Sequence, residues 1–169
     1  MKKISLLMVV LFGVSSFAVA QQYPGKGTID INGGIGLGHN LSGSGGMPIN
    51  LAVDYGINEE VSVGGYLGYL SSNETFGAGE WKYSNLIVGG RATYHKEFVE
   101  DIDTYGGIIL GYNVASAEWN GPGNNKATAG GIVYQGFVGA RYHFTESLGA
   151  YGELGFGIAV LQLGLTFRL

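Results

Sequence analysis

The sequence predicts an all-β fold, an eight-stranded antiparallel up-and-down transmembrane β-barrel, and three observations lead to this prediction. Residues 161–169 alternate strictly between large apolar residues and polar or small ones, which is the period of a strand. Glycine makes up 32 of the 169 residues, and charged residues make up 13%, about half of the usual ~25%. No stretch after residue 20 is long and apolar enough for a spanning helix, so a membrane protein with this sequence must form a closed barrel.

The N-terminus has the features of an export signal. Its first lysines form a positive start, residues 4–14 form an apolar run, and Ala-Val-Ala at 18–20 fits a cleavage site. A transmembrane helix is the alternative, but the apolar run is short for one. We therefore predict a signal peptide over 1–20 and an outer-membrane β-barrel domain over 21–169.

The first two predicted strands cover residues 28–38 and 47–57, and a Gly/Ser-rich loop over 39–46 joins them. In each strand, large apolar residues occupy alternate positions, and small or polar residues occupy most positions between them. The polar face of this pair carries Asp30, Asn32, Asn50 and Asp54.

The third and fourth predicted strands cover residues 61–70 and 81–94. The alternation is clear in the third strand, whereas the first residues of the fourth are ambiguous and Ile87 falls on the polar side. Residues 71–80 are interpreted as a polar loop, and 95–103 as a long turn that carries four acids.

The fifth and sixth predicted strands cover residues 104–115 and 131–144. The segment between them, 116–128, is interpreted as a loop, because its Asn-Gly-Pro-Gly-Asn-Asn run is too polar and too broken for a strand. The polar face of this pair carries Tyr105, Asn113, Gln135, Arg141 and His143.

The last two predicted strands cover residues 148–157 and 161–169, with a short link over 158–160. Turn lengths alternate along the chain, as they do in barrels with short periplasmic turns and longer outer loops. The short link and the long turn over 95–103 depart from this alternation.

The apolar faces are predicted to meet lipid. A secreted lipocalin-like barrel with the apolar face inside is the alternative. The other face is rich in glycine and amides and poor in lysine, which suits a narrow lumen better than a water-exposed wall. Aromatic residues of the apolar face also fall into two belts at the strand ends, as bilayer interfaces favour. One belt comprises Tyr55, Tyr94, Tyr142, Phe144 and Phe167, and the other comprises Tyr69, Tyr112, Tyr134 and Phe156.

The inward face carries three charges of each sign, which must find partners in a lumen with little room for water. We predict pairs between Arg168 and Asp30, between Arg141 and Glu153, and between Arg91 and Asp54. A structural network is the favoured interpretation, and a conduction path or proton relay is the alternative. The network comprises Asp30, Asp54, Arg91, Arg141, Glu153 and Arg168.

No catalytic, cofactor or metal site is predicted. The sequence has no G-x-S-x-G, no H-E-x-x-H and no P-loop, and its three histidines are scattered. The net charge of −4 without a basic stripe argues against nucleic acid as a partner, and the absence of cysteine excludes disulfides. An outer-rim site for lipid A modification is the remaining enzymatic alternative, built from a histidine, a serine and an acid. Its candidates are His39, Ser71, Ser72 and Glu74.

The whole predicted domain resembles the small outer-membrane β-barrel family of OmpX/OmpA-like, porin-type eight-stranded barrels. The resemblance is carried by residues 105–113, 139–146, 151–155 and the final strand. It implies no common enzymatic activity, and it implies that the barrel assembly machinery reads the terminal strand. Members of that family usually end in Phe, whereas this chain ends in Leu169 with Phe167 two residues before it.

We therefore expect an integral protein of a Gram-negative outer membrane, with both termini periplasmic and a side-chain-filled polar lumen. The expected role is structural or adhesive through the outer loops, with a narrow porin or small-molecule conduit as the alternative and a lipid A-modifying enzyme as the third. Outer-membrane lipid, lipopolysaccharide and the assembly machinery are the expected partners, and no cofactor is expected. Acids in the turns are expected to solvate the periplasmic rim: Glu59, Glu60, Glu97, Glu100, Asp101, Asp103 and Glu146.

Overall fold

The computed structural model describes residues 25–169 except 43, 78, 100, 122 and 124. The predicted signal peptide over 1–20 lies outside the described residues. Within the described part, no helix is long and apolar enough to cross a membrane.

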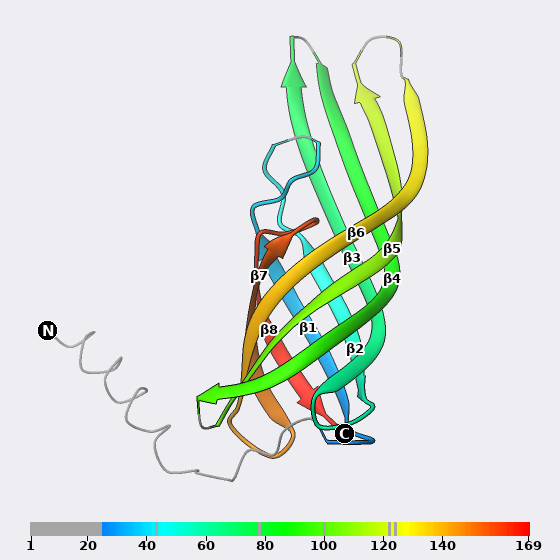
Figure 1. Ribbon diagram of the computed structural model, residues 1–169. Helices are drawn as coiled ribbons and strands as arrows, with labels where there is room; N and C mark the ends of the chain where they lie inside the picture. Colours follow the sequence, from blue (N-terminus) through cyan, green and yellow to red (C-terminus); the bar gives the residue numbers. More distant parts are fainter. Residues whose placement is uncertain (1–24, 43, 78, 100, 122, 124) are drawn as a thin grey trace, which may run out of the picture.

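The chain forms a closed barrel of eight strands in which each strand pairs antiparallel with its neighbours in sequence, and β8 pairs with β1 (Figure 1). This confirms the predicted fold class. The upper end in Figure 1 carries the β3–β4 and β5–β6 hairpins, and the lower end carries Leu169. The strands are β1 (Ile29–Leu37), β2 (Ile49–Gly56), β3 (Val61–Phe76), β4 (Gly79–Val99), β5 (Ile102–Asn120), β6 (Lys126–His143), β7 (Leu148–Phe156) and β8 (Leu161–Arg168).

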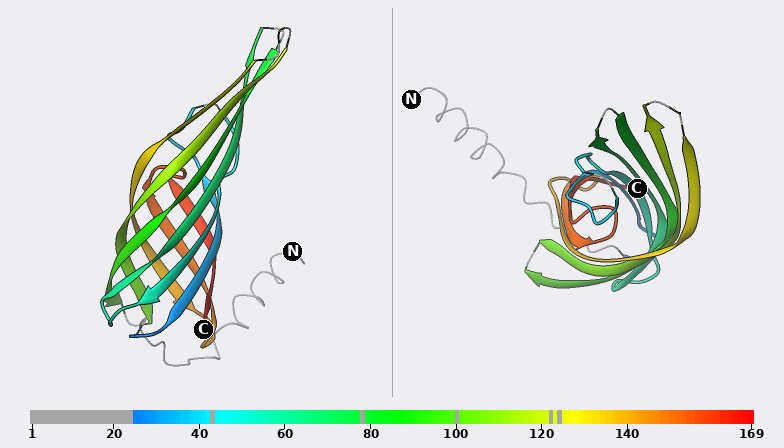
Figure 2. Two further views of the ribbon diagram at one scale, coloured as in Figure 1. Left: turned by 90° about the vertical axis from the view of Figure 1, so that its right-hand side faces the viewer. Right: turned by 90° about the horizontal axis from the view of Figure 1, so that it is seen from above.

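Strands β3 to β6 are longer than predicted and rise above the rest of the barrel (Figure 2). The predicted loops over 71–80 and 116–128 are largely strand, because their polar residues pair across the sheet instead of leaving it. Thr75, for example, lies directly opposite Glu80, and Glu118 lies directly opposite Lys126. The β3–β4 hairpin turns tightly at Gly77, whose φ of 58° suits glycine.

The predicted long turn over 95–103 is also mostly strand. Strand β4 continues to Val99 and β5 begins at Ile102, so the connection is a tight hairpin. Asp101 lies in its turn with a φ of 66°, a conformation that aspartate tolerates better than most residues.

The apolar faces point outward, as predicted. Leu165 is 58% exposed and Phe167 is 46% exposed, whereas Arg141 is 1% exposed and Glu153 is 3% exposed. A lipocalin-like assignment requires the opposite arrangement, so the structure excludes it. Most residues of the two predicted aromatic belts are exposed on the outer surface: Tyr55, Tyr69, Tyr94, Tyr112, Tyr134, Tyr142, Phe156 and Phe167.

Glycines on the inner face leave room for large side chains in a narrow lumen. A Cβ on Gly34 would lie 2.5 Å from the Tyr151 hydroxyl, and one on Gly164 would lie 2.6 Å from Tyr151 Cε1. The Tyr151 side chain therefore fills space that these two glycines leave open, which accounts for part of the high glycine content.

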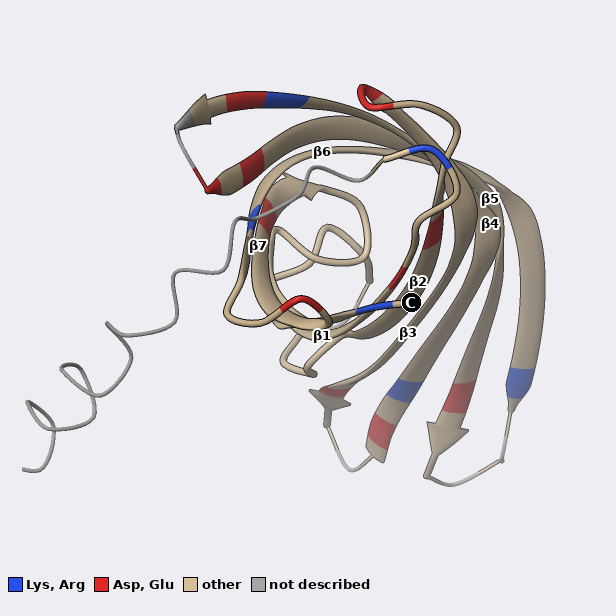
Figure 3. Cartoon of the chain, turned by 90° about the horizontal axis from the view of Figure 1, so that it is seen from below, with Lys and Arg blue, Asp and Glu red and all other residues tan. Residues whose placement is uncertain are grey.

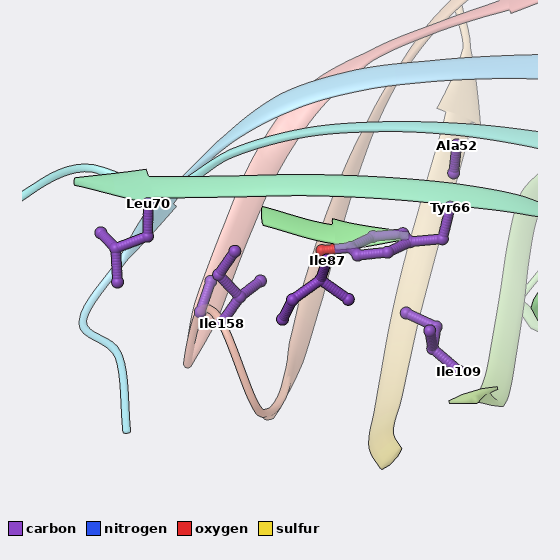
Figure 4. Close-up of a cluster of buried hydrophobic side chains, with 7 residues drawn as sticks. Ala52, Tyr66, Leu70, Ile87, Ile109 and Ile158 are labelled. Carbon is purple, nitrogen blue, oxygen red and sulfur yellow. The ribbon is translucent and has the colours of Figure 1, made fainter. Parts of the chain in front are cut away.

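The lumen is not polar throughout, which corrects the prediction. Its upper part is filled by an apolar cluster (Figure 4), and Leu70 and Ile158 in this cluster have no exposed surface. The alternation placed Ile87 inward, but it gave no signal for the inward position of Ile158, which lies between two strands. The cluster comprises Ala52, Tyr66, Leu70, Ile87, Ile109, Ile158 and Ala159.

The β7–β8 link folds into the mouth of the barrel. This explains why it is shorter than the alternation of turn lengths predicts. Gly157 has a φ of 133°, and the Ile158 backbone N–H donates to Gln135 Oε1 at 3.3 Å. Leu41 of the β1–β2 loop packs against the same cluster. The upper mouth is therefore closed by apolar side chains from two connections.

Candidate functional site

Arg91 is the centre of the upper half of a buried charge network in the lumen. Its Nη2 lies 2.6 Å from Glu153 Oε1, and its Nε lies 3.2 Å from Asp54 Oδ1. The Tyr105 hydroxyl donates to Glu153 Oε1 at 3.0 Å, and the Asn32 amide donates to Asp54 Oδ2 at 2.9 Å. Both acids near Arg91 therefore have a second polar partner, as buried charges require.

Asp30 is the centre of the lower half of the network. It lies 2.6 Å from Arg141 Nη1 and 2.8 Å from Arg168 Nε. Arg141 Nη2 also lies 3.6 Å from Asp54 Oδ2, which joins the two halves. The guanidinium of Arg141 lies 5.1 Å from the centre of the Tyr105 ring.

The structure brings two of the three predicted pairs together. Arg168 lies against Asp30 and Arg91 lies against Asp54, but the predicted pair between Arg141 and Glu153 is wrong. Arg141 is directly opposite Asp103 on β5, and it extends to Asp30, while Glu153 pairs with Arg91. Position on adjacent strands was not sufficient to choose a partner, because long side chains in a narrow lumen reach across it.

The lumen also holds a hydrogen-bonded serine, histidine and aspartate that were not predicted from the sequence. The Ser62 hydroxyl lies 2.8 Å from His95 Nε2, and His95 Nδ1 lies 2.9 Å from Asp103 Oδ1. Asp103 was predicted to solvate the rim, but it is 8% exposed and faces the lumen. Extending the alternation of β4 and β5 by a few residues would have placed His95 in line with Arg91, and Asp103 in line with Tyr105.

This serine, histidine and acid have the order of a hydrolase triad, but their surroundings favour a structural role. Ser62 is 2% exposed and His95 is 1% exposed, so a substrate carbonyl cannot reach the hydroxyl without opening the wall. Asp103 lies 3.9 Å from Arg141, so these three residues are connected to the charge network.

Every strand of the barrel contributes to the combined network. It therefore acts as an internal cross-link between strands that are far apart in sequence. The contributors, in strand order, are Asp30, Asp54, Ser62, Arg91 with His95, Asp103 with Tyr105, Arg141, Glu153 and Arg168.

The space left in the lumen is small. A cavity of about 10 Å³ lies beside Gln135, Phe137 and Glu153, which is at the lower limit for one water molecule. Ile109 and Ala159 of the apolar cluster line the same cavity. This packing favours a plug over a conduction path.

The upper halves of β3 to β6 form what we call the projecting sheet, residues 71–85 and 115–131. Strand β7 pairs with β6 only from Gly136 to His143, so β6 forms an edge of this sheet from Lys126 to Gln135. The few charged residues lie near its upper end (Figure 3). They are Glu74, Glu80, Lys82, Glu118 and Lys126.

The residues proposed for an outer-rim enzyme do not assemble. The ring nitrogens of His39 contact the backbone carbonyls of Leu41 and Gly45, 3.2 and 2.8 Å away. The Ser72 hydroxyl donates to the Ser42 carbonyl at 2.9 Å. Neither contact joins His39 to Ser71, Ser72 or Glu74. Among the described residues, no group of three histidines or acids could hold a metal ion.

No family profile and no curated protein matches the chain. Solved structures with the same fold include Ail, the attachment invasion locus protein of Yersinia pestis, in complex with the heparin analogue sucrose octasulfate. That match has 14% identity and a TM-score of 0.57, and it covers 85% of this chain and 99% of Ail.

Two further structures share the fold. The N-terminal β-barrel domain of Pseudomonas aeruginosa OprF is 16% identical with a TM-score of 0.56, and the match covers 86% of this chain and 99% of that domain. Neisserial surface protein A is 15% identical with a TM-score of 0.54, over 84% of this chain and 94% of that protein. The fold of this chain is therefore that of small outer-membrane β-barrels, in agreement with the resemblance seen in the sequence.

Proposed function

We propose that the chain is an adhesin, an integral barrel of a Gram-negative outer membrane that presents its projecting sheet to partners outside the cell. The observation that carries this proposal is the sheet itself, whose strands rise above the lipid-facing band while the lumen below is filled. Such a protein, with a filled lumen and strands that extend into water, offers a surface for binding partners and not a path for conduction.

The proposed orientation puts the projecting sheet outside and both termini in the periplasm. The lower end has three tight connections, at 57–60, 100–101 and 144–147, and such short turns are typical of the periplasmic side. Lipid and lipopolysaccharide would surround the apolar band, and the barrel assembly machinery would insert the chain.

The heparin analogue bound to Ail does not carry over to this chain. Recognition of a sulfated sugar requires a cluster of cations, whereas the projecting sheet holds two lysines among three glutamates. Lys126 lies 3.9 Å from Glu118, which further reduces the positive field. The proposed partner is therefore not a polyanion.

Two other roles are less well supported. A narrow porin or small-molecule conduit requires a continuous path, and the apolar cluster interrupts it. A lipid A-modifying enzyme requires an assembled outer-rim triad, and His39 contacts its own loop instead. We therefore keep the prediction that the protein is not an enzyme.

The test is to express the precursor in a non-adherent Gram-negative host, fractionate the cells and measure their attachment to host-cell surfaces. Replacing 73–82 and 118–126 each by Asn-Gly shortens both upper hairpins between directly opposite residues. The proposal expects this variant to reach the outer membrane without conferring attachment. The matched control replaces 98–102 in the lower hairpin by Asn-Gly in the same way, between the opposite residues Glu97 and Asp103. This variant should retain attachment. Attachment by the shortened variant, or no attachment by the natural chain, would contradict the proposal.

A further inference from the structure

The projecting sheet reverses the side-chain pattern of the barrel wall. Below it, apolar residues face out and polar residues face the lumen. In the sheet, the outward face carries Lys82, Glu118 and Lys126 as direct neighbours across three strands. The face that continues the lumen wall carries aromatic residues and alanines, with Glu74 of β3 directly opposite Trp81. A lipid-facing surface would not carry that row of charges, so this part of the sheet stands in water.

Three aromatic side chains form a platform on the inner face of the projecting sheet. Trp81 and Trp119 are opposite each other with ring centres 5.3 Å apart, and the Tyr83 ring lies 6.4 Å from Trp81. Two glycines make room for Trp119. A Cβ on Gly79 would lie 2.2 Å from Trp119 Cζ2, and one on Gly121 would lie 2.7 Å from Cε2. The position of this indole therefore depends on the absence of side chains at both glycines.

A cavity of about 220 Å³ opens beside this platform, at the mouth of the barrel. Tyr83 forms its aromatic wall, and its described lining holds no charged side chain. Asn85 accepts a hydrogen bond from the Asn113 amide at 2.9 Å, which leaves the Asn85 NH₂ group as a donor. The cavity is lined by Ser42, Tyr83, Asn85, Ala115, Ser116, Ala117, Ala127 and Ala129.

We propose that this face binds a neutral saccharide chain, with one sugar ring in the cavity and a neighbouring ring against Trp81 and Trp119. This inference rests on the proposed adhesive function and names its partner class. Sugar rings present apolar C–H faces that pack on aromatic rings, and hydroxyls that pair with uncharged amides and hydroxyls. The small alanine side chains leave the space that a ring needs.

The charge distribution separates a neutral saccharide from other occupants. A sulfated or acidic sugar would need cations at the cavity, but Lys82 and Lys126 lie on the opposite face of the sheet. An acyl chain would need contact with the bilayer, but this part of the sheet stands in water. A peptide that adds to the β6 edge would not need the aromatic platform.

The experiment uses the whole mature chain in lipid nanodiscs, first on an array of neutral and sulfated glycans. The strongest neutral oligosaccharide is then titrated while tryptophan emission is recorded. Trp81 and Trp119 are the two tryptophans of the chain, so this emission reports on the platform alone. The inference expects a saturable shift of the emission to shorter wavelength.

Matched variants separate the platform from general effects on the sheet. Trp81→Ala or Trp119→Ala should each weaken binding about tenfold. Gly79→Val keeps both tryptophans but displaces an indole, and it should weaken binding similarly. Lys82→Ala and Glu118→Ala change the opposite face of the same strands and should bind as the natural chain does. Migration on unheated gels shows whether each variant is folded.

Three results would overturn the inference: binding to sulfated glycans alone, binding to no glycan, or unchanged affinity in both tryptophan variants. The attachment assay keeps this failure distinct from failure of the proposed function. Cells that still adhere with Trp81→Ala and Trp119→Ala would overturn the saccharide site and leave the adhesin proposal standing. A natural chain that confers no attachment would overturn the adhesin proposal.

Discussion

Asp30 and Arg168 stand directly opposite each other where the first and last strands close the barrel, with Asp30 Oδ1 2.8 Å from Arg168 Nε. Asp30 also lies 2.6 Å from Arg141, which comes from the far side of the lumen. One carboxylate therefore ties the closing seam to the opposite wall.

Asp30→Asn should destabilise the barrel by about 3 kcal/mol, because it leaves two guanidinium groups without their shared acid in a buried site. The measurement is urea unfolding in lipid vesicles, followed by migration on unheated gels. Glu59→Gln in the exposed β2–β3 turn is the control and should change stability by less than ~0.5 kcal/mol. Equal stabilities of the two variants would show that the seam does not depend on this pair.

Arg91 and Glu153 should be strongly coupled, because their side chains are each almost fully buried and lie 2.6 Å apart. In a double-mutant cycle with Arg91→Met and Glu153→Gln, the double variant should be more stable than the sum of the single losses predicts, by about 2 kcal/mol. The same urea assay checks this. Additive losses would mean that Asp54 or Tyr105 can replace the missing partner.

The boundary between lipid and water should appear in a pair of arginine substitutions. Leu165→Arg lies in the apolar band and should cost about 2–4 kcal/mol. Ser84→Arg lies on the outward face of the projecting sheet near Lys82 and should be nearly neutral. A large loss from Ser84→Arg would place the projecting sheet in the bilayer and remove the basis of the adhesin proposal.

The lumen should not conduct. In planar bilayers the natural chain should give no steady openings, because apolar side chains close its upper mouth. Exchanging Ile87 and Ile158 for serine together should admit water and ions if this cluster is the barrier. Steady openings of the natural chain would support the porin alternative instead.

Alternation located the lipid-facing side of the strands because each position there faces either hydrocarbon or a narrow lumen. The same rule did not locate the upper ends of the strands, since the outward face of the projecting sheet carries Lys82, Glu118 and Lys126 and the apolar alternation ends there. Glu118 therefore resembled a loop residue, although it pairs with Lys82 across β4 and β5.

The partners of the inward charges were harder to predict than their direction. The strand order requires Asp30 and Arg168 to meet, so that pair follows from the sequence. The choice of Arg141 between Glu153, Asp103 and Asp30 depends on side-chain reach inside the lumen, which periodicity does not describe. Ile158 belongs to no strand, so no pattern could place it inside.

The central claim is that the apolar face of each strand meets lipid while the other face fills the lumen. The natural chain has no cysteine, so single-cysteine variants at Leu163, Leu165, Gln162 and Thr166 can each carry one spin label. Electron paramagnetic resonance in vesicles then measures the accessibility of each label to oxygen and to a water-soluble nickel chelate. We predict that labels at 163 and 165 are accessible to oxygen but not to nickel, and that labels at 162 and 166 are shielded from both. Labels at 163 and 165 shielded from both reagents, with labels at 162 and 166 accessible to nickel, would contradict the account.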